Sequence, residues 1–288
     1  MFFQSGKLAH HLAQGRFISL RRIFQQKKTK LGLAVVVLYV LVALLAPVLA
    51  PHDPTAVDVT LKLQTFSWEY PLGTDQLGRC VLSRLIWGSR VSLLYGSTIL
   101  LITLLIGVPV GMISGYVGKR WDAALMRVTD IFLALPSFIV VLAIAGSLGA
   151  SGFNLVLAMS LSYWAQYARV SRALTLKIKG ESYFQALKTG GLSHVRILCK
   201  HVLRNIMPSI LALATVEMGT IILSIAGYSF IGMGVQPPHP EWGIMLSDSR
   251  SFIQTMPQLM LYPGITIMLI VFAVNVLGEG VQDGLSKK

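Results

Sequence analysis

The sequence predicts an all-α integral membrane protein that crosses a bilayer six times. Of its 288 residues, 54% are hydrophobic and 13% are charged, whereas about a quarter of the residues in a soluble domain are charged. Six long apolar runs alternate with polar segments, and a hydrocarbon core of ~30 Å needs about 20 apolar residues per helix. Lys and Arg gather in alternate connections, which is the pattern of cytoplasmic loops.

The formal net charge of +13 has two interpretations. One is nucleic-acid binding, which needs a basic face on a folded domain. The other is the bias of Lys and Arg toward the cytoplasmic side of a membrane. Residues 1–30 hold seven Lys or Arg and no acid, and residues 171–208 hold seven against Glu181 alone. Both clusters flank apolar runs, so we expect membrane lipid as a partner and no nucleic acid.

Residues 1–30 are predicted to form a basic cytoplasmic tail with a short interfacial helix, because apolar and basic residues alternate before the first apolar run. That run, 31–50, is predicted to be a retained transmembrane helix. The alternative is a cleaved signal peptide, but signal cores span about 7–15 residues. Residues 51–90 then form an extracytoplasmic segment.

Residues 91–280 are predicted to be the membrane core, followed by a cytoplasmic tail at 281–288. A long cytoplasmic loop, 171–208, interrupts the core, and both termini are expected in the cytoplasm because every basic connection then lies on one side. The predicted helices of the core are 91–116, 124–148, 153–170, 209–235 and 258–278.

Small residues and prolines within these helices predict how they pack. Gly107, Gly111 and Gly115 recur every four residues, which lets two helix backbones approach closely. Pro109 and Pro136 fall inside predicted spans and are expected to kink them.

No sequence pattern for catalysis is present. The pairs Lys28-Thr29 and Lys188-Thr189 do not follow the glycine that a phosphate-binding loop requires. The chain is therefore predicted not to be an enzyme, and any ATP hydrolysis must come from a separate chain. Its two cysteines, Cys80 and Cys199, are expected on opposite sides of the membrane, where they cannot pair.

The loop from Glu181 to Ile210 mixes apolar and basic residues. This mixture predicts short amphipathic helices at the membrane face that bind a soluble partner. Gly190-Gly191 is a natural break between two of them.

The loop resembles the "EAA" loop of permeases from importers of the ATP-binding-cassette class, in which Glu-Ala-Ala is followed by three residues and then Gly. Here the triplet is Gln185-Ala186-Leu187, with Gly191 as the glycine. Gln185 replaces the acid, and Arg204 stands where Pro is usual. Other residues match the peptide/nickel branch of this family: Ser193, Arg196, His201 and Asn205.

More stretches resemble the same branch, and specifically its second-permease type. Cys80 departs from that pattern, which usually has Asp there. The matching stretches are 71–79 (PLGTDQLGR), 83–84 (SR), 88–90 (GSR), 229–238 (SFIGMGVQPP) and 241–243 (EWG).

The resemblance implies a type I importer permease bundle in the cell membrane. It implies three kinds of protein partner: a second homologous permease, two ATPase subunits and an extracytoplasmic solute-binding protein. The chain itself would bind no cofactor, and the ATPase subunits would use ATP with Mg²⁺. The residues implied to couple the loop to the ATPases are Gln185, Ala186, Leu187, Gly191, Ser193 and Arg196.

Ionisable residues inside spans cost ~2.5–3.5 kcal/mol on insertion scales, so each is a candidate site. Glu217 lies in the fifth predicted helix and is the main candidate for the translocation path, together with Trp164 and Tyr167, which resemble residues of nickel permeases. Asp130 is expected to form a structural ion pair with Arg127, three residues earlier.

The resemblance leaves two classes of transported solute open. Peptide-carrying relatives commonly place a Glu at the position of Ile225, whereas nickel permeases resemble this chain in carrying the acid earlier, at Glu217. The favoured solute is nickel or a metal–chelator complex, and the alternative is a di- or oligopeptide. Two other function classes compete. An intramembrane hydrolase needs paired catalytic groups at depth, and a gated channel needs no docking loop of this length.

Overall fold

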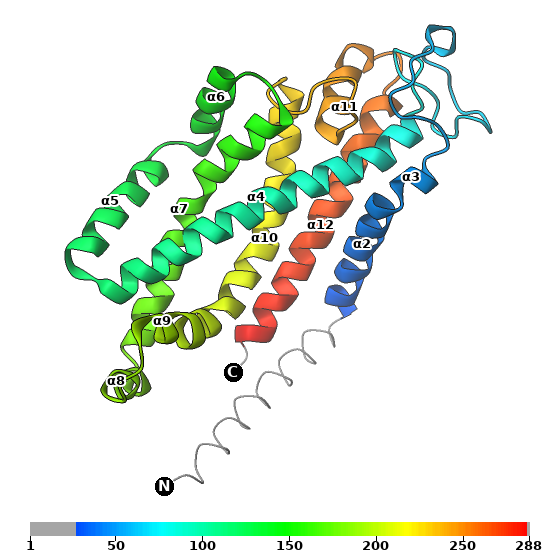
Figure 1. Cartoon of the computed structure of the whole chain (residues 1–288). Coiled ribbons are helices and arrows are strands. Elements are labelled where there is room, and N and C mark those ends of the chain that lie inside the picture. Colours follow the sequence, from blue (N-terminus) through cyan, green and yellow to red (C-terminus); the bar gives the residue numbers. More distant parts are fainter. Residues whose placement is uncertain (1–26, 287–288) are drawn as a thin grey trace.

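The computed structural model describes residues 27–286, and every regular element in this range is a helix (Figure 1). The predicted interfacial helix of the tail lies outside the described residues. The long helices are α2 (Lys27–Leu44), α4 (Val81–Val117), α5 (Lys119–Ala134), α6 (Ser137–Leu148), α7 (Gly152–Lys179), α10 (Leu203–Phe230) and α12 (Gln258–Ser286). The short elements are α3 (Ala46–Leu49), α8 (Ser182–Thr189), α9 (His194–Arg196), α11 (Trp242–Ser249), a π-helical turn (Ile197–Val202) and 3-10 turns at Val59–Leu61 and Arg250–Phe252.

Three helical segments within the described range are long and apolar enough to cross a membrane: Val81–Val117, His194–Phe230 and Gln258–Gly284. A fourth is added if α5 and α6 count as one broken span. The bundle is therefore a multi-pass membrane fold, and six crossings remain a prediction. Among the described residues, α8, α9 and the start of α2 lie at one end of the bundle, whereas α11 and the segment after α3 lie at the other (Figure 1).

The predicted single helix over 124–148 is wrong. The structure has α5 and α6 instead, with an 87° bend between them. Leu135 adopts an extended conformation (φ −90°, ψ 135°) before Pro136, because a proline ring disfavours helical geometry in the preceding residue.

Two helices also begin earlier than predicted. The second starts at Val81 and the fifth at Leu203, rather than at 91 and 209. Their first turns are polar enough to lie beyond the hydrocarbon core, so apolar runs alone did not reveal them.

The predicted glycine ridge is confirmed as the contact between α4 and α7. A Cβ added to Gly107 would lie 2.4 Å from the carbonyl oxygen of Trp164, and one on Gly111 would lie 2.1 Å from that of Ala168. At Gly115 the nearest atom, the oxygen of Arg172, would be 3.0 Å away. The two backbones therefore approach at distances that no larger residue permits.

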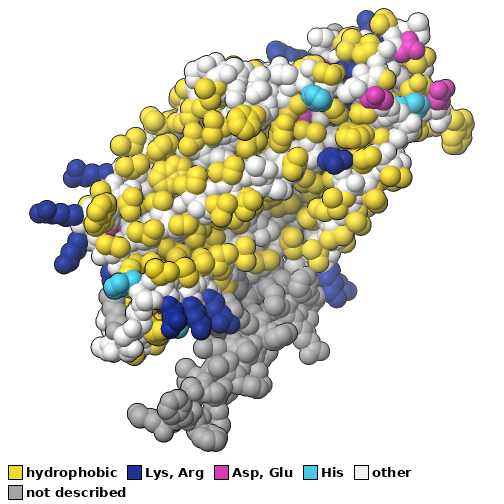
Figure 2. Space-filling view, in the orientation of Figure 1, with side chains coloured by type: hydrophobic (Ala, Val, Ile, Leu, Met, Phe, Trp, Pro, Cys, Tyr) yellow, Lys and Arg dark blue, Asp and Glu magenta, His cyan; other side chains and the backbone are white. Residues whose placement is uncertain are grey.

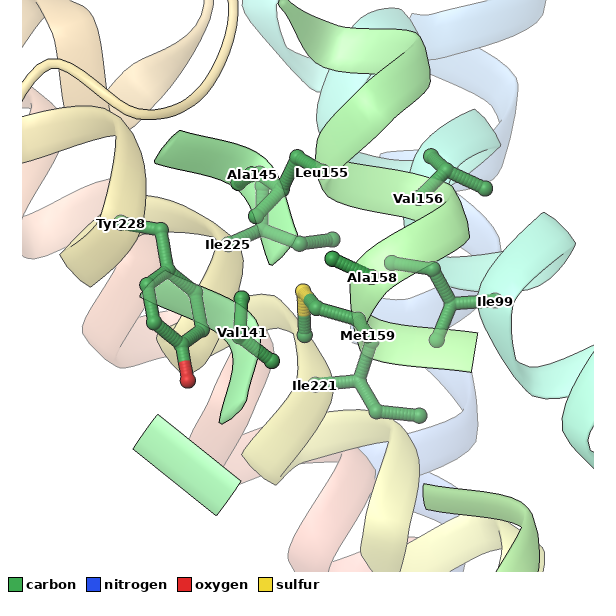
Figure 3. Close-up of a cluster of buried hydrophobic side chains, with 10 residues drawn as sticks. All are labelled: Ile99, Val141, Ala145, Leu155, Val156, Ala158, Met159, Ile221, Ile225 and Tyr228. Carbon is green, nitrogen blue, oxygen red and sulfur yellow. The ribbon is translucent and has the colours of Figure 1, made fainter. Parts of the chain in front are cut away.

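A second packing cluster lies nearer the α11 end and joins α4, α6, α7 and α10 (Figure 3). Ile99, Leu155 and Ile225 in it are completely buried. On the face shown in Figure 2, apolar side chains cover the middle of the bundle, and Lys and Arg side chains project at the α8–α9 end. Cys80 directly precedes α4, and Cys199 lies in the π-helical turn after α9, so the two free thiols are far apart along the bundle and unpaired, as predicted.

Candidate functional site

The predicted coupling loop folds as α8, a glycine turn, α9 and the π-helical turn. Gly191 has φ +73°, a left-handed conformation that glycine adopts without steric cost. The Gly-Gly break between two short helices is thus confirmed, and it gives a physical reason for a glycine at position 191.

Phe184 and Tyr116 anchor this loop to the bundle. Phe184 is completely buried, and its ring meets the ring of Tyr116 at the end of α4 edge-on, with centroids 6.1 Å apart. The Tyr116 hydroxyl lies 2.5 Å from Nδ1 of His194, and Nδ2 of Asn205 donates to the Tyr183 hydroxyl at 3.1 Å. These contacts tie α8, α9 and α10 to one end of α4.

The predicted docking residues lie on the outer side of these anchors. Leu187 is half-buried and packs against a buried apolar cluster that includes Tyr116, Phe184 and Ile197. The others are exposed: Gln185, Ala186, Gly191, Ser193 and Arg196. A surface that is exposed while its base is firmly packed can receive a partner and transmit its movement to the helices.

Polar contacts brace the same end of the bundle and were not predicted. Asp122 of α5 accepts two hydrogen bonds from Arg172 of α7, at 2.5 and 2.7 Å, and a third from Ser114 at 2.5 Å. Nζ of Lys179 donates to the carbonyl oxygen of Tyr116 at 2.9 Å. Helices α4, α5 and α7 are therefore joined where the coupling loop attaches.

Glu217 lies halfway along α10 and faces Gln166, which lies halfway along α7. Each residue stands fourteen positions after the first residue of its 28-residue helix and thirteen before the last. Nε2 of Gln166 donates to Oε1 of Glu217 at 2.9 Å. The sequence indicated the carboxylate, but Gln166 carries no charge and its partner lies 51 residues away, so its role was missed.

The structure does not place Trp164 and Tyr167 on the same exposed surface as Glu217. Trp164 is 8% exposed and meets the ring of Phe132 edge-on. Tyr167 is 1% exposed, and its Cβ would lie 2.7 Å from a side chain added at Gly107. Both aromatic residues pack inside the chain.

Asp130 pairs with Arg169 of α7 and not with Arg127, so that predicted pair is wrong. Nη2 of Arg169 lies 2.5 Å from Oδ1 of Asp130, whereas among the described residues no ion pair joins Arg127 to Asp130. Spacing along one helix suggested Arg127, but a residue on the neighbouring helix lies closer. The side chains of Arg169 and Asp130 are 56% and 60% exposed.

At the opposite end, a buried ion-pair network joins the stretch 71–84 to the segment between α10 and α12. Nε of Arg79 lies 2.7 Å from Oδ2 of Asp75, and its Nη2 lies 3.0 Å from Oδ2 of Asp248. Nε and Nη2 of Arg84 lie 3.5 and 3.4 Å from the same two oxygens. Arg79 and Arg84 are almost completely buried, which charged side chains tolerate only when they are paired.

Glu241 and Trp242 join α11 to α4 by further hydrogen bonds. The buried Glu241 caps α11 by accepting from the backbone N–H groups of Gly243 and Ile244 at 2.9 and 3.1 Å, and it accepts from the Ser92 hydroxyl at 3.1 Å. Burial raises the pKa of this carboxyl. Nε1 of Trp242 donates to the carbonyl oxygen of Leu85 at 3.1 Å.

Residues 27–286 contain no group of three or more His, Cys, Asp or Glu placed to hold a metal ion. A cavity of about 510 Å³ near α3 has His52, Asp53 and His239 in its lining, together with Trp87 and several prolines. It is a surface hollow at the α11 end, away from Glu217.

Two family models match separate parts of this chain. Residues 107–288 match the model of the binding-protein-dependent transport system inner membrane component. Residues 18–65 match the model of the N-terminal TM domain of oligopeptide transport permease C.

Several curated proteins are 38% identical to this chain. The nickel transport system permease protein NikC of Escherichia coli K12 aligns over 89% of this chain and 92% of its own length. For the dipeptide transport system permease protein DppC of Alkalihalophilus pseudofirmus the shares are 93% and 90%. For the metal-staphylopine import system permease protein CntC of Staphylococcus aureus both are 94%.

The fold is also found among solved structures. A chain of the MetNI methionine ABC transporter, in an inward-facing conformation, superposes with a TM-score of 0.57 at 16% sequence identity. The match covers 70% of this chain and 97% of the other.

Proposed function

Because this chain belongs to the family of binding-protein-dependent transport system inner membrane components, within the peptide and nickel importers of the ATP-binding-cassette class, we propose that it forms half of the membrane path for nickel or a metal–chelator complex. As a member of this family it is a multi-pass inner-membrane permease subunit and not an enzyme. The family membership follows from the comparisons, whereas the identity of the transported solute is our proposal.

The observation that supports a positively charged solute is Glu217. Its carboxylate lies at mid-length of α10, is only partly buried, and has the neutral Gln166 as its hydrogen-bond donor. A carboxylate at membrane depth is costly unless it faces a water-filled path or a partner group. Such a group attracts a metal ion or an ammonium group to the middle of the path.

Import of di- or oligopeptides by the same kind of complex is the second candidate. It is supported by a dipeptide permease that is as similar to this chain as the nickel permease. The position where peptide-carrying relatives commonly have Glu is Ile225, which is completely buried here. This chain thus lacks the acid that peptide-carrying relatives commonly have there, and that difference favours the metal cargo over a peptide.

We propose that two ATPase subunits bind the exposed surface of the coupling loop, that a second homologous permease completes the path, and that an extracytoplasmic binding protein delivers the solute. ATP and Mg²⁺ belong to the ATPase subunits. Closure of the ATPase pair would move α8 and α9, and the anchored Phe184 would carry that movement into α4 and α10.

Uptake of radiolabelled nickel and of a radiolabelled dipeptide, in cells with and without this chain, tests the solute. Nickel uptake that is saturable and lost on deletion, with dipeptide uptake intact, supports the metal cargo, and the reverse pattern rejects it. Glu217→Gln should lower cation uptake while the ATPase subunits still copurify. Glu279→Gln, at the exposed end of α12, is the matched control and should import normally.

The docking proposal has its own test. Ala186→Asp puts a charge on the exposed surface of α8 and should abolish copurification of the ATPase subunits. Val59→Asp makes the same kind of change at a residue that is 67% exposed at the opposite end, and it should leave copurification intact. Equal copurification by both variants would reject docking at α8.

A further inference from the structure

The Asp130–Arg169 pair is unusual because it is exposed on helices that belong to the membrane bundle. More than half of each side chain is accessible. Arg169 stands ten residues before the end of α7, about 15 Å along the axis. The predicted span 153–170 ends one residue beyond Arg169, so the pair lies near the end of the membrane segment that leads to the coupling loop. An ion pair there, with both side chains accessible, can face water or a protein partner.

Arg169 and Gln166 are neighbours on one face of α7. Residues three apart on a helix have Cβ atoms about 5–6 Å from each other. Gln166 holds Glu217 of α10, and Arg169 holds Asp130 of α5. These two pairs form a continuous polar strip across α5, α7 and α10. The carboxylate of Glu217 lies at one end of the strip, and the guanidinium of Arg169 lies about one helical turn closer to the coupling loop.

Both charged groups in this strip keep unused bonding capacity. One N–H group of Arg169 donates to Asp130, whereas a guanidinium has five. Only Oε1 of Glu217 accepts a hydrogen bond from within residues 27–286, which leaves Oε2 open. An arginine so placed can bind a carboxylate through two parallel N–H groups while it keeps its contact with Asp130.

We propose that this strip is a dipolar cargo site, in which Glu217 binds the positive part of the solute and Arg169 binds a carboxylate on it. The inference rests on the proposed function and narrows its solute. The cargo is a metal complex whose chelator carries free carboxylates, or a zwitterionic peptide, and not a bare hydrated cation, which the Arg169 guanidinium would repel. Asp130 positions that guanidinium.

The test uses the complete importer in cells, with two probes: radiolabelled nickel with excess L-histidine, which is a carboxylate-bearing chelator, and a radiolabelled dipeptide. Arg169→Gln should lower the uptake of the imported probe at least about tenfold, the loss expected for a charge-assisted contact. Arg169→Lys should lose less, since it keeps the charge without the planar fork. Arg127→Gln, an exposed arginine of α5, is the matched control and should import normally.

The double variant separates cargo binding from a structural ion pair. If Arg169 only neutralises Asp130, then Asp130→Asn combined with Arg169→Gln should restore uptake. If Arg169 contacts the cargo, the double variant should be as slow as Arg169→Gln, and Asp130→Asn alone should lose only about threefold because the guanidinium remains but is less well oriented. Copurification of the ATPase subunits checks assembly of every variant.

The outcomes also separate this inference from the proposed function. Wild-type cells that import neither probe would overturn the proposed function, and the site with it. Wild-type uptake that Arg169→Gln leaves unchanged, or that the double variant restores, would overturn the dipolar site alone. Uptake of nickel only in the absence of chelator would also overturn it.

Discussion

Arg79 and Asp248 lie 169 residues apart in the chain, yet Nη2 of Arg79 is 3.0 Å from Oδ2 of Asp248. This contact holds the residues that precede α4 against the last turn of α11. Arg79 belongs to one of the family-like stretches, and Asp248 lies five residues after another. Their spatial contact gives these distant stretches a shared structural role, which is to close the α11 end of the bundle.

The network predicts a large loss of stability when one partner is removed. Arg79→Met should leave Asp75 and Asp248 with less compensation in a buried site, at a cost of about 3–5 kcal/mol. Lys62→Met, at an exposed lysine of the same segment, is the control and should have little effect. Thermal unfolding of the detergent-solubilised protein measures both, and equal melting temperatures would contradict the buried network.

The contact between α4 and α7 predicts that Gly111 tolerates no side chain. Gly111→Ala would place a Cβ 2.1 Å from the backbone oxygen of Ala168, so the helices must separate, at a cost of about 1–3 kcal/mol. Gly146→Ala is the matched control, because a Cβ there meets nothing within 4 Å. That change should stabilise α6 by up to about 1 kcal/mol through helix propensity. Opposite shifts in melting temperature are expected, and shifts of the same sign would contradict the close approach.

Hydrophobic patterning was sufficient to predict the membrane class, the glycine ridge and the two-helix coupling loop. These features depend on local composition and spacing. Hydrophobic patterning did not predict where α4 and α10 begin, because a polar first turn can be helical outside the hydrocarbon core. The break between α5 and α6 was mistaken for a kink, since a proline in an apolar run is compatible with either.

The sequence predicted the acidic residues of the candidate site but not their hydrogen-bond and ion-pair partners. Glu217 and Asp130 were found because an acid inside an apolar run is conspicuous. Their partners, Gln166 and Arg169, lie on α7, and nothing in the chain order shows which face of α7 meets α10 or α5. The aromatic residues Trp164 and Tyr167 were assigned by resemblance, whereas in the fold they fill the space beside α4 and α5.

The buried Glu241 predicts a pH dependence with a definite sign. Burial raises the pKa of this carboxyl above the ordinary value of about 4.3, so the folded protein holds its proton more tightly than the unfolded chain. The contribution of this pKa difference to the free energy of unfolding is fully present below about pH 4, and it is lost as the pH rises through the raised pKa. Glu241→Gln has no proton to lose at this position. Its melting temperature relative to wild type should therefore increase from pH 5 to pH 8, and a difference that does not change with pH would contradict the effect of burial.

Phe184 predicts that coupling can be lost without loss of docking. Phe184→Ala removes a completely buried ring from the base of α8 and should cost about 3–5 kcal/mol in local packing. The exposed docking residues would remain, so the ATPase subunits should still copurify, but solute-stimulated ATP hydrolysis should fall because α8 no longer moves rigidly with Tyr116. Phe184→Leu should restore part of the coupling by refilling most of the volume. Val195→Ala, at a residue of the same loop that is 70% exposed, is the control. Wild-type stimulation in Phe184→Ala would show that movement reaches the helices by another contact, such as that between Tyr183 and Asn205.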